Sequence, residues 1–193
     1  FRLLPSGKVF QPILKPRGIN SIYVDASEII AKQLEKVGIK ALVRTEDTSI
    51  FYTRAHAGKH QIVVYAVSGA NTPIMRALSY FPVGATVFWC PLYRLYYMSD
   101  GEEGVPIPEG SDIERLVEIY EAASTEPDAD KRNALIREAM VIHIDNLWRV
   151  GVSSYASWPM VISNRLMNMT DNPTEAGGPG GHFTFAEQFW LKQ

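Results

Sequence analysis

Helix and strand patterns alternate between residues 25 and 67. Asp25 and Glu28 are three residues apart, the layout of a capping box in which each side chain accepts a backbone N–H at the start of a helix. Gly38 predicts the end of this helix, because glycine tolerates the left-handed conformation that closes helices. The apolar stripe between these signals has helical period and comprises Ile29, Ile30, Leu34 and Val37.

Two short apolar runs predict strands on either side of a second helix. Residues 39–43 are mostly apolar, as in a strand covered on both faces, and residues 61–67 are rich in β-branched side chains. Asp47 can cap the helix between them, and Gly58 can end it. A strand, a helix and a strand in this order predict parallel pairing with a right-handed crossover.

The first sixteen residues carry weaker signals. A Pro-Ser-Gly turn is expected between Leu4 and Lys8. The prolines at positions 12 and 16 restrict strand formation after this turn, because proline cannot donate to a strand ladder. We therefore expect no more than an edge strand, based on the alternation of Val9, Gln11 and Ile13.

Two amphipathic helices are predicted between residues 111 and 147. Ser111 and Glu114 form a second capping-box pattern, and the expected buried stripe is Ile113, Leu116, Val117 and Tyr120. Asp130 can cap the next helix, whose expected stripe is Ala134, Leu135, Ala139, Ile142 and Leu147. We expect this pair to be antiparallel and to flank the sheet. Residues 148–155 and 159–162 look like strands, and the composition of residues 172–181 indicates a flexible connection.

The segment between residues 80 and 110 is rich in aromatic residues, prolines and glycines and shows no sustained period. It predicts an irregular region, after a helix that starts at Thr72 and Pro73. Ligands of open parallel sheets collect beyond the carboxyl ends of strands. The candidate ligand-binding residues are therefore those after the strand at 61–67 and the aromatic residues of the irregular segment: Tyr65, Ser68, Gly69, Asn71, Trp89 and Tyr93. Packing in the core explains the aromatic residues equally well.

Composition narrows the function class. The chain has 46% apolar and 21% charged residues, as in globular proteins, and its net charge of −2 gives no electrostatic case for nucleic acid. The acidic segment from residue 100 to 145 is expected to be a solvated face. Cys90 is the one cysteine, which excludes an internal disulfide, and its apolar neighbours indicate a buried, inert thiol. No run is long and apolar enough for a membrane span.

Enzyme and cofactor signatures are missing from the sequence. No GxGxxG, P-loop, GxSxG or HExxH pattern occurs. His56 and His60 are four residues apart, but Gly58 falls between them, so we expect exposed turn histidines and no metal. His143 is expected to be partly buried and hydrogen-bonded. Nothing fixes Glu102 and Glu103 in the geometry of a catalytic pair. We therefore expect neither a catalytic residue nor a cofactor.

The chain resembles extracytoplasmic solute-binding proteins of family 5, the dipeptide and oligopeptide receptors of bacterial ABC importers. The resemblance lies in ASEIIAKQLEKVGIKALV, FYTRAHAGKHQIVVYAV, DADKRNALIREAMVIHIDN, WRVGVSSYASWPMVISNRL and the closing QFWLK. It covers most of this chain but only the carboxyl-terminal part of a family member. Because the chain opens with Phe1 and has no signal pattern, we expect an excised domain or a processed product.

The resemblance implies an α/β fold, the distal lobe of a type II periplasmic-binding-protein-like fold with a mixed sheet flanked by helices. Residues 1–150 would form this lobe, and residues 151–193 would return to a missing first lobe. The implied function is non-catalytic solute capture, with a transmembrane permease as partner. The implied receptor is a monomer, periplasmic or otherwise extracytoplasmic, with any membrane tether in a part absent here. The rivals are an α/β hydrolase or transferase with a loop-built site, and a protein-interaction domain.

One departure from the resembling family bears on the ligand. Family members hold a peptide's amino terminus with an aspartate in the loop after the strand that corresponds to residues 61–67. Here that loop reads VSGANTP and contains no acid. A buried ammonium group needs an opposite charge, so the departure favours sugars or modified peptides over free peptides.

Overall fold

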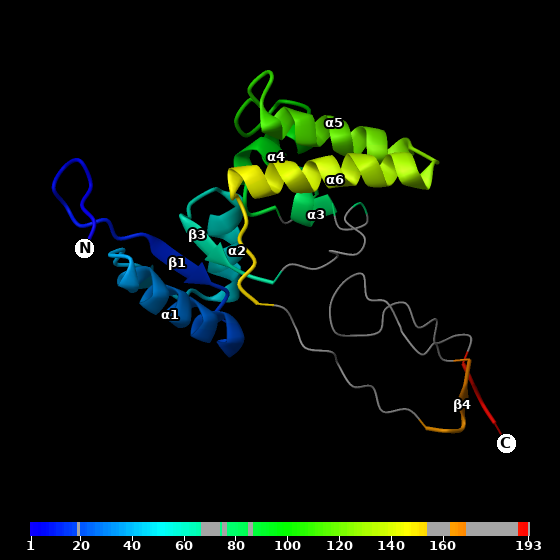
Figure 1. The fold of residues 1–193 in the computed structure, drawn as a ribbon, viewed down its shortest axis with the longest axis horizontal. Coiled ribbons are helices and arrows are strands. Elements are labelled where there is room, and N and C mark those ends of the chain that lie inside the picture. Colours follow the sequence, from blue (N-terminus) through cyan, green and yellow to red (C-terminus); the bar gives the residue numbers. More distant parts are fainter. Residues whose placement is uncertain are drawn as a thin grey trace. The chain divides into compact units, whose positions relative to one another are not determined.

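The computed structural model describes residues 1–18, 20–66, 74, 77–84, 87–153, 163–168 and 189–192. The described strands are β1 (Ile13–Pro16), β2 (Leu42–Val43), β3 (Ile62–Val64), β4 (Leu166–Met167) and β5 (Trp190–Leu191). The described helices are α1 (Ser21–Lys36), α2 (Thr48–His56), α3 (Ala77–Tyr80), α4 (Pro91–Met98), α5 (Asp112–Thr125) and α6 (Ala129–Asn146) (Figure 1).

The chain divides into two compact units. The sheet unit comprises residues 1–66 and 82–107, and the helical unit comprises residues 67–81 and 108–193. The expected division at residue 150 stays a prediction. None of the helices within the described residues combines the length and apolar character that a bilayer crossing requires.

A three-stranded parallel sheet in the order β2-β1-β3 forms the centre of the sheet unit. The parallel direction was predicted, but β2 and β3 do not pair with each other, because β1 lies between them. Helix α1 packs along all three strands (Figure 1). The α/β fold class is thus confirmed.

The edge-strand prediction for the first residues is wrong. Strand β1 is central, starts at Ile13 and buries Leu14 completely. The Arg44 N–H donates to the Leu14 carbonyl, so alternate residues, including Pro16, direct their main-chain polar groups toward β2. Strand β2 ends at Val43, which pairs with Leu14. A backbone N–H at position 16 would therefore point past the end of β2, so a proline is tolerated there. The predicted turn before β1 is confirmed by hydrogen bonds between Leu4 and Lys8 and between Gly7 and Leu4.

Helix α1 begins earlier than predicted, and the capping box at Asp25 is wrong. Asn20 is the N-cap, and its side chain accepts the Ile22 N–H at 3.0 Å. Residues 22–24 belong to the first turn of the helix, and Tyr23 packs against Tyr65. The face of α1 that packs on the sheet includes Ser27, Ile30 and Leu34, whereas Ile29 and Val37 are exposed.

The ends of α1 and α2 confirm the local signals. Gly38 has a φ of +81° after α1, and the Ile39 N–H donates back to the Leu34 carbonyl, which is the Schellman arrangement. Asp47 caps α2 by accepting the Ser49 N–H, and Gly58 follows α2 with a φ of +66°. Strands β2 and β3 both occur, each shorter than the run that predicted it.

The irregular-region prediction is wrong over residues 91–98, which form α4 and pack on α2. Pro91 occupies the first turn of α4, where its missing N–H costs nothing, and no side chain caps the helix. Packing of its aromatic and leucine side chains therefore supports α4 more than local sequence does. The predicted helix start at residues 72 and 73 lies outside the described residues.

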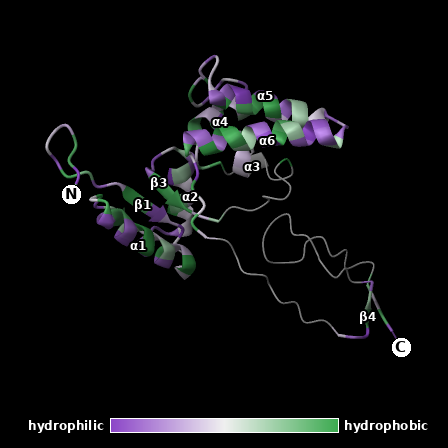
Figure 2. Cartoon of the chain, in the orientation of Figure 1, coloured by the Kyte–Doolittle hydropathy of each residue, from purple (hydrophilic) through white to green (hydrophobic). Residues whose placement is uncertain are grey.

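In the helical unit, α5 and α6 pack as an antiparallel pair with alternating apolar and polar faces (Figures 1 and 2). The Glu114 N–H donates to Ser111 Oγ as predicted, while Glu114 accepts the Gly110 N–H. The buried residues of α5 are Ile113, Leu116, Ile119 and Ala123. Val117 and Tyr120 are partly buried, so the stripe was predicted only in part.

Two predictions about α6 are wrong. Asp128 is the N-cap in place of Asp130, and it accepts the N–H groups of Asp130 and Lys131. Ala134 and Leu147 are exposed, whereas His143 takes a place in the buried stripe beside Ala139. Residues 148–153 are not a strand, because the chain continues irregularly from the end of α6. The predicted strand residues 154–155 and 159–162 and the predicted connection at 172–181 lie outside the described residues.

Candidate functional site

The carboxyl ends of the three parallel strands lie at one edge of the sheet. Arg17 and Gly18 follow β1, residues 45–48 follow β2 and lead into α2, and Tyr65 follows β3. A further parallel bridge joins Arg17 to Glu46 and extends the ladder to this edge. We call these seven residues, 17, 18, 45–48 and 65, the carboxyl edge. Ligands of open α/β sheets bind at such edges, so it is the candidate functional site.

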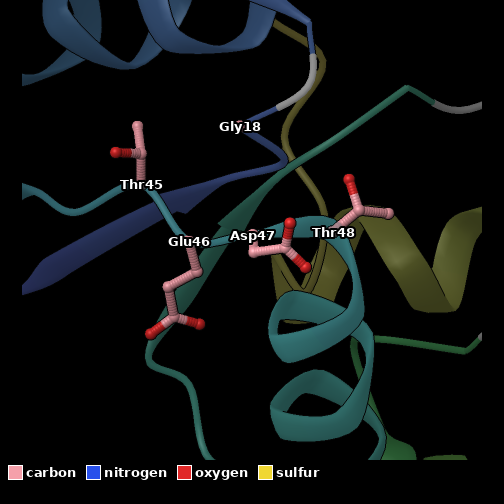
Figure 3. A pocket seen from close by; sticks show the side chains of 5 residues that line it. All are labelled: Gly18, Thr45, Glu46, Asp47 and Thr48. Atoms are coloured by element: carbon pink, nitrogen blue, oxygen red, sulfur yellow. The ribbon is translucent and has the colours of Figure 1, made fainter.

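A pocket of about 330 Å³ opens at the carboxyl edge, lined by Gly18 and residues 45–48 (Figure 3). Backbones approach closely here, because a Cβ built on Gly18 would lie 2.8 Å from the Glu46 carbonyl oxygen. Glycine is therefore required by space at this position. The pocket combines hydroxyl, carboxylate and main-chain polar groups, which suit a polar ligand.

Glu46 is the centre of an ion-pair network beside the pocket. Its Oε1 atom accepts from Lys15 Nζ at 2.9 Å and from Arg54, and its side chain is 13% exposed. Burial on its own raises the pKa of the Glu46 carboxyl, but the hydrogen bonds from Lys15 and Arg54 outweigh burial and lower the pKa overall. Glu46 is thus an ionised carboxylate whose charge is already matched by two cations.

Arg17 lies beside two tyrosines whose rings also contact each other. Its guanidinium carbon is 5.6 Å from the ring centroid of Tyr52 and 5.8 Å from that of Tyr65, and its NH1 group donates to Tyr65 Oη at 3.3 Å. The two tyrosine hydroxyls lie 2.9 Å apart and share a hydrogen bond. Cation–π contact with the two rings and the hydrogen bond from Arg17 to Tyr65 Oη fix the guanidinium in place.

Tyr65 also belongs to a compact aromatic cluster. Its ring stacks with Tyr23 at a centroid distance of 5.6 Å and with Phe51 at 6.1 Å, and it meets Phe88 edge-on at 5.3 Å. Phe51 is 1% exposed, so the cluster is anchored in the core of the sheet unit. Phe88 connects this cluster to the segment that carries Trp89 and Tyr93.

The expectation that His56 and His60 are exposed turn residues is wrong. The His56 ring stacks on Phe88 with an interplanar angle of 16°, and His60 Nε2 lies 2.8 Å from the Phe88 carbonyl oxygen. Burial lowers the pKa of both imidazoles. No group of three or more metal-ligating side chains occurs in the described part of the chain.

Three residues that could carry enzyme chemistry have surroundings that suit a structural role. The Cys90 thiol is 5% exposed, and burial raises its pKa far above neutrality, so it remains a thiol as predicted. His143 is buried as predicted, with Nε2 at 2.7 Å from the Tyr80 carbonyl oxygen and a pKa lowered by burial. His60 is committed to a main-chain carbonyl in the same way.

The structure places three of the six predicted ligand-binding residues. Tyr65 lies at the carboxyl edge, Trp89 directly precedes α4, and Tyr93 lies in the first turn of α4, all partly buried. Ser68, Gly69 and Asn71 lie outside the described residues. The assignment of all six to ligand binding stays a prediction.

Sequence reasoning missed Arg17, Gly18, Glu46 and Tyr52. The rule that ligands bind beyond parallel strands applies equally to β1, but its prolines concealed that strand. Had residues 13–16 been read as a strand, the Arg-Gly pair after them would have marked the same edge as Tyr65.

No protein-family model matches the chain, and no curated protein matches it. Among solved structures, NikA from Brucella suis in complex with Fe(III)-EDTA is 20% identical over 71% of this chain and 24% of its own, with a TM-score of 0.54. The periplasmic binding protein MelB from Agrobacterium fabrum, in complex with stachyose, is 15% identical over 75% of this chain and 20% of its own, with a TM-score of 0.56.

A periplasmic oligopeptide-binding protein of an ABC transporter from Thermotoga maritima is 19% identical over 77% of this chain and 26% of its own, with a TM-score of 0.50. The same protein has also been solved with bound mannohexaose. This chain spans about a quarter of the length of these structures or less. At such identities the likeness is one of fold: the chain has the α/β fold of a part of the periplasmic binding proteins.

Proposed function

We propose that this chain is one lobe of a non-catalytic solute-binding protein that captures a polar solute at its carboxyl edge. The observation that carries the proposal is a pocket lined by Gly18 and residues 45–48 at the carboxyl ends of parallel strands, the same edge of the sheet at which Arg17 and Tyr65 follow β1 and β3. A fold like that of periplasmic binding proteins supports it. Of the titratable candidates for catalysis, Cys90 is buried, His60 and His143 each contact a main-chain carbonyl oxygen, and Glu102 and Glu103 are exposed.

The finer assignment follows the resemblance to family 5 of the solute-binding proteins. Residues 1–150 would form the distal lobe, and residues 151–193 would return to a first lobe elsewhere in a longer polypeptide. The solute would close the two lobes by a hinge motion, since it stabilises the state in which both lobes contact it. The closed, monomeric receptor would then deliver the solute to the permease of an ABC importer outside the cytoplasm.

Specific roles are proposed for the six predicted ligand-binding residues. Ser68 and Asn71 would hydrogen-bond the solute, and Gly69 would offer its main-chain N–H. Trp89 would stack on the solute and Tyr93 would line the rim. Tyr65 would stack on the solute as well; its ring also contacts Tyr23, Phe51 and Phe88, and its hydroxyl is hydrogen-bonded to Arg17 and Tyr52.

The class of solute is a peptide, an oligosaccharide or another polar molecule. The similar structures hold Fe(III)-EDTA, stachyose and mannohexaose, and one is named an oligopeptide-binding protein. The predicted ligand-binding residues combine hydroxyl and amide groups with flat aromatic rings, and this composition suits neutral polar ligands, because rings supply contact area at low entropic cost and amides supply directional hydrogen bonds.

Tryptophan fluorescence of the complete natural polypeptide that carries this sequence tests the proposal. It is titrated with a panel of oligopeptides and oligosaccharides. We expect saturable quenching by at least one member, and a loss of affinity well above twofold in the double variant Ser68→Ala with Asn71→Ala. A double variant within about twofold of the wild type would contradict the roles of these two residues. Detectable turnover of a bound solute would contradict the non-catalytic assignment.

A further inference from the structure

Two histidines near the end of α2 hold Phe88, the residue before Trp89. The His56 ring stacks on the Phe88 ring, and His60 contacts the Phe88 carbonyl oxygen; we call these two contacts the histidine clamp. We propose that His56 and His60 are positioning residues that hold Trp89 in place for the solute, and that acid opens the clamp. The inference rests on the proposed function, because it concerns the regulation of that same site.

The His60 contact acts on the main chain directly before Trp89. His60 Nε2 lies 2.8 Å from the Phe88 carbonyl oxygen, which belongs to the planar peptide unit that leads into Trp89. A carbonyl oxygen only accepts, so the hydrogen of the neutral imidazole lies on Nε2. The Nδ1 atom is buried and has no hydrogen-bond partner among the described residues. Protonation would place a buried N–H there without an acceptor, which is costly.

The His56 contact acts on the Phe88 side chain. The two rings are nearly parallel, with centroids 5.8 Å apart, and the Phe88 ring also meets Tyr65 edge-on at 5.3 Å. The stack thus connects the end of α2 to the carboxyl edge. His56 Nε2 is buried without a hydrogen-bond partner in the described part of the chain. Both nitrogens of a protonated imidazole carry a hydrogen, so a protonated His56 would also have an unmatched donor.

The charges that act on the two imidazoles are positive. Burial lowers the pKa of His56 and of His60. Arg94 on α4 lowers the pKa of His56 further. Lys15 on β1 lowers that of His60, although the contact with the Phe88 carbonyl opposes part of this shift. A second positive charge at either histidine would therefore be repelled as well as desolvated.

Among the described residues, one carboxylate connects to this group, and it is already paired. Glu46 is bound to Lys15 and to Arg54, so it does not compensate a charge on His60. The charged or titratable side chains that contact the two histidines, Phe88 or the two cations are Lys15, Glu46, Tyr52, Tyr65, Cys90 and Arg94.

The direction of the pH dependence follows from the lowered pKa values. An imidazole whose pKa is lowered in the clamped state stabilises that state fully above its ordinary pKa of 6.5. This stabilisation is lost as the pH falls through the lowered pKa. Solute affinity should decline with it, because a released Trp89 must be ordered again when the solute binds.

The test measures solute affinity at two pH values with solutes that do not titrate: stachyose, mannohexaose and N-acetyl-trialanine amide. Calorimetric titration of the complete natural polypeptide is carried out at about pH 7.5 and at about pH 5, on either side of the ordinary imidazole pKa. Glu46 keeps its charge at both values, since its pKa lies below 4.5. Where only an oligopeptide of the fluorescence panel binds, it is used instead, because its own ionisation affects the wild type and the variants equally.

The variants preserve the contacts and remove the titration. In the double variant His56→Phe with His60→Gln, a phenyl ring can stack on Phe88 and an amide can donate to its carbonyl, but neither takes up a proton. His143→Gln is the matched control. His143 has the same kind of contact, to the Tyr80 carbonyl oxygen, but lies on α6 in the helical unit.

We expect the wild type to lose affinity about fivefold or more at the lower pH, and the double variant to stay within about twofold of its neutral affinity. His143→Gln should keep the loss seen in the wild type. His60→Ala should weaken binding at neutral pH, and His60→Gln should restore it, because only the amide replaces the hydrogen bond. If the double variant does not fold, His56→Phe and His60→Gln decide the question singly, since each should remove part of the pH dependence.

Three results would overturn the inference while the proposed function stands. The first is a wild-type affinity that is equal at the two pH values. The second is a pH dependence that persists unchanged in the double variant or in both single variants. The third is an equal loss of pH dependence in His143→Gln. If none of the three solutes and no oligopeptide of the fluorescence panel binds to the wild type, the proposed function fails, and the inference fails with it.

Discussion

Arg17 of the sheet unit and Arg115 of the helical unit have opposite surroundings. Arg115 donates to Glu118 at 2.8 Å and to both oxygens of Glu138 at 2.7 and 3.1 Å, all on the exposed side of α5 and α6. Arg17 has two tyrosines and no carboxylate among the described residues. Arg115 thus has carboxylate partners within the pair of helices α5 and α6. Arg17 at the carboxyl edge has no carboxylate partner among the described residues. Polar side chains that lack a protein partner and are held by a rigid scaffold are typical of binding sites.

The cores of the two units also differ in whether their buried residues contact the candidate site. Leu116 and Ile119 are fully buried between helices whose caps and stripes are local in sequence. In the sheet unit, Phe51 is buried in an aromatic cluster that also shapes the candidate site. Packing of α5 against α6 therefore supports stability, whereas the aromatic packing of the sheet unit also positions Tyr65 at the candidate site.

The largest expected effect separates these two roles. Phe51→Ala should lower the free energy of unfolding by about 3–5 kcal/mol and Leu116→Ala by about 2–5 kcal/mol, because each leaves a cavity. Denaturant unfolding measures both. Only Phe51→Ala should also weaken solute binding, since it releases Tyr65. Ile144→Ala is the control, because Ile144 is 67% exposed, and it should change stability by less than about 0.5 kcal/mol. Equal losses of affinity in the first two variants would contradict the division of roles.

The ion-pair network at Glu46 predicts a dependence of stability on pH. The folded state lowers the pKa of Glu46 below its ordinary value of 4.5. Its contribution is therefore fully present above pH 4.5 and lost as the pH falls through the folded-state pKa. Glu46→Gln should cost about 1.5–3 kcal/mol at neutral pH. The unfolding free energy of the variant should then fall less steeply below pH 4.5 than that of the wild type, and an identical slope would contradict the network's role.

The close backbone approach at Gly18 predicts a smaller loss. Gly18→Ala should destabilise the protein by about 1–3 kcal/mol, because its Cβ would lie 2.8 Å from the Glu46 carbonyl oxygen, which cannot move away freely. Thermal unfolding measures the change. Gly151→Ala is the matched control, since nothing lies within 4 Å of its added Cβ. If both variants unfold at the same temperature, the strands do not approach as described.

The smallest effect is expected on the helical pair. Glu138→Gln removes one exposed partner of Arg115 and should cost about 0.2–1 kcal/mol at low salt, less at high salt. Denaturant midpoints at two salt concentrations measure it. Solute affinity should not change. A loss of affinity as large as that of the double variant Ser68→Ala with Asn71→Ala would show that the helical pair takes part in binding.

Local signals predicted much of the fold. Asp47, Gly38, Gly58 and the Ser111 cap act on their own helix ends, so single residues were sufficient evidence. The helix starts at Asn20 and Asp128 were misassigned by a few residues, because several polar residues nearby can cap equally well. Helix α4 depends on tertiary packing, which periodicity does not record.

The candidate site was predicted only in part. Tyr65 was found because the strand before it is rich in β-branched residues. Arg17 was missed because its contacts join positions 48 residues apart, and no local pattern specifies such a pairing. The prolines around β1 also suggested an edge strand. They are tolerated in the central strand because Pro16 lies beyond the end of β2, and this register is a property of the assembled sheet that the sequence does not reveal.

Hydrogen exchange of the complete natural polypeptide, read by mass spectrometry with and without its tightest solute, tests binding at the carboxyl edge most directly. We predict that the solute slows exchange in the segments around residues 17–20, 45–52 and 65, and leaves α5 and α6 unchanged. Protection confined to α5 and α6, with none at the carboxyl edge, would contradict solute capture at this edge.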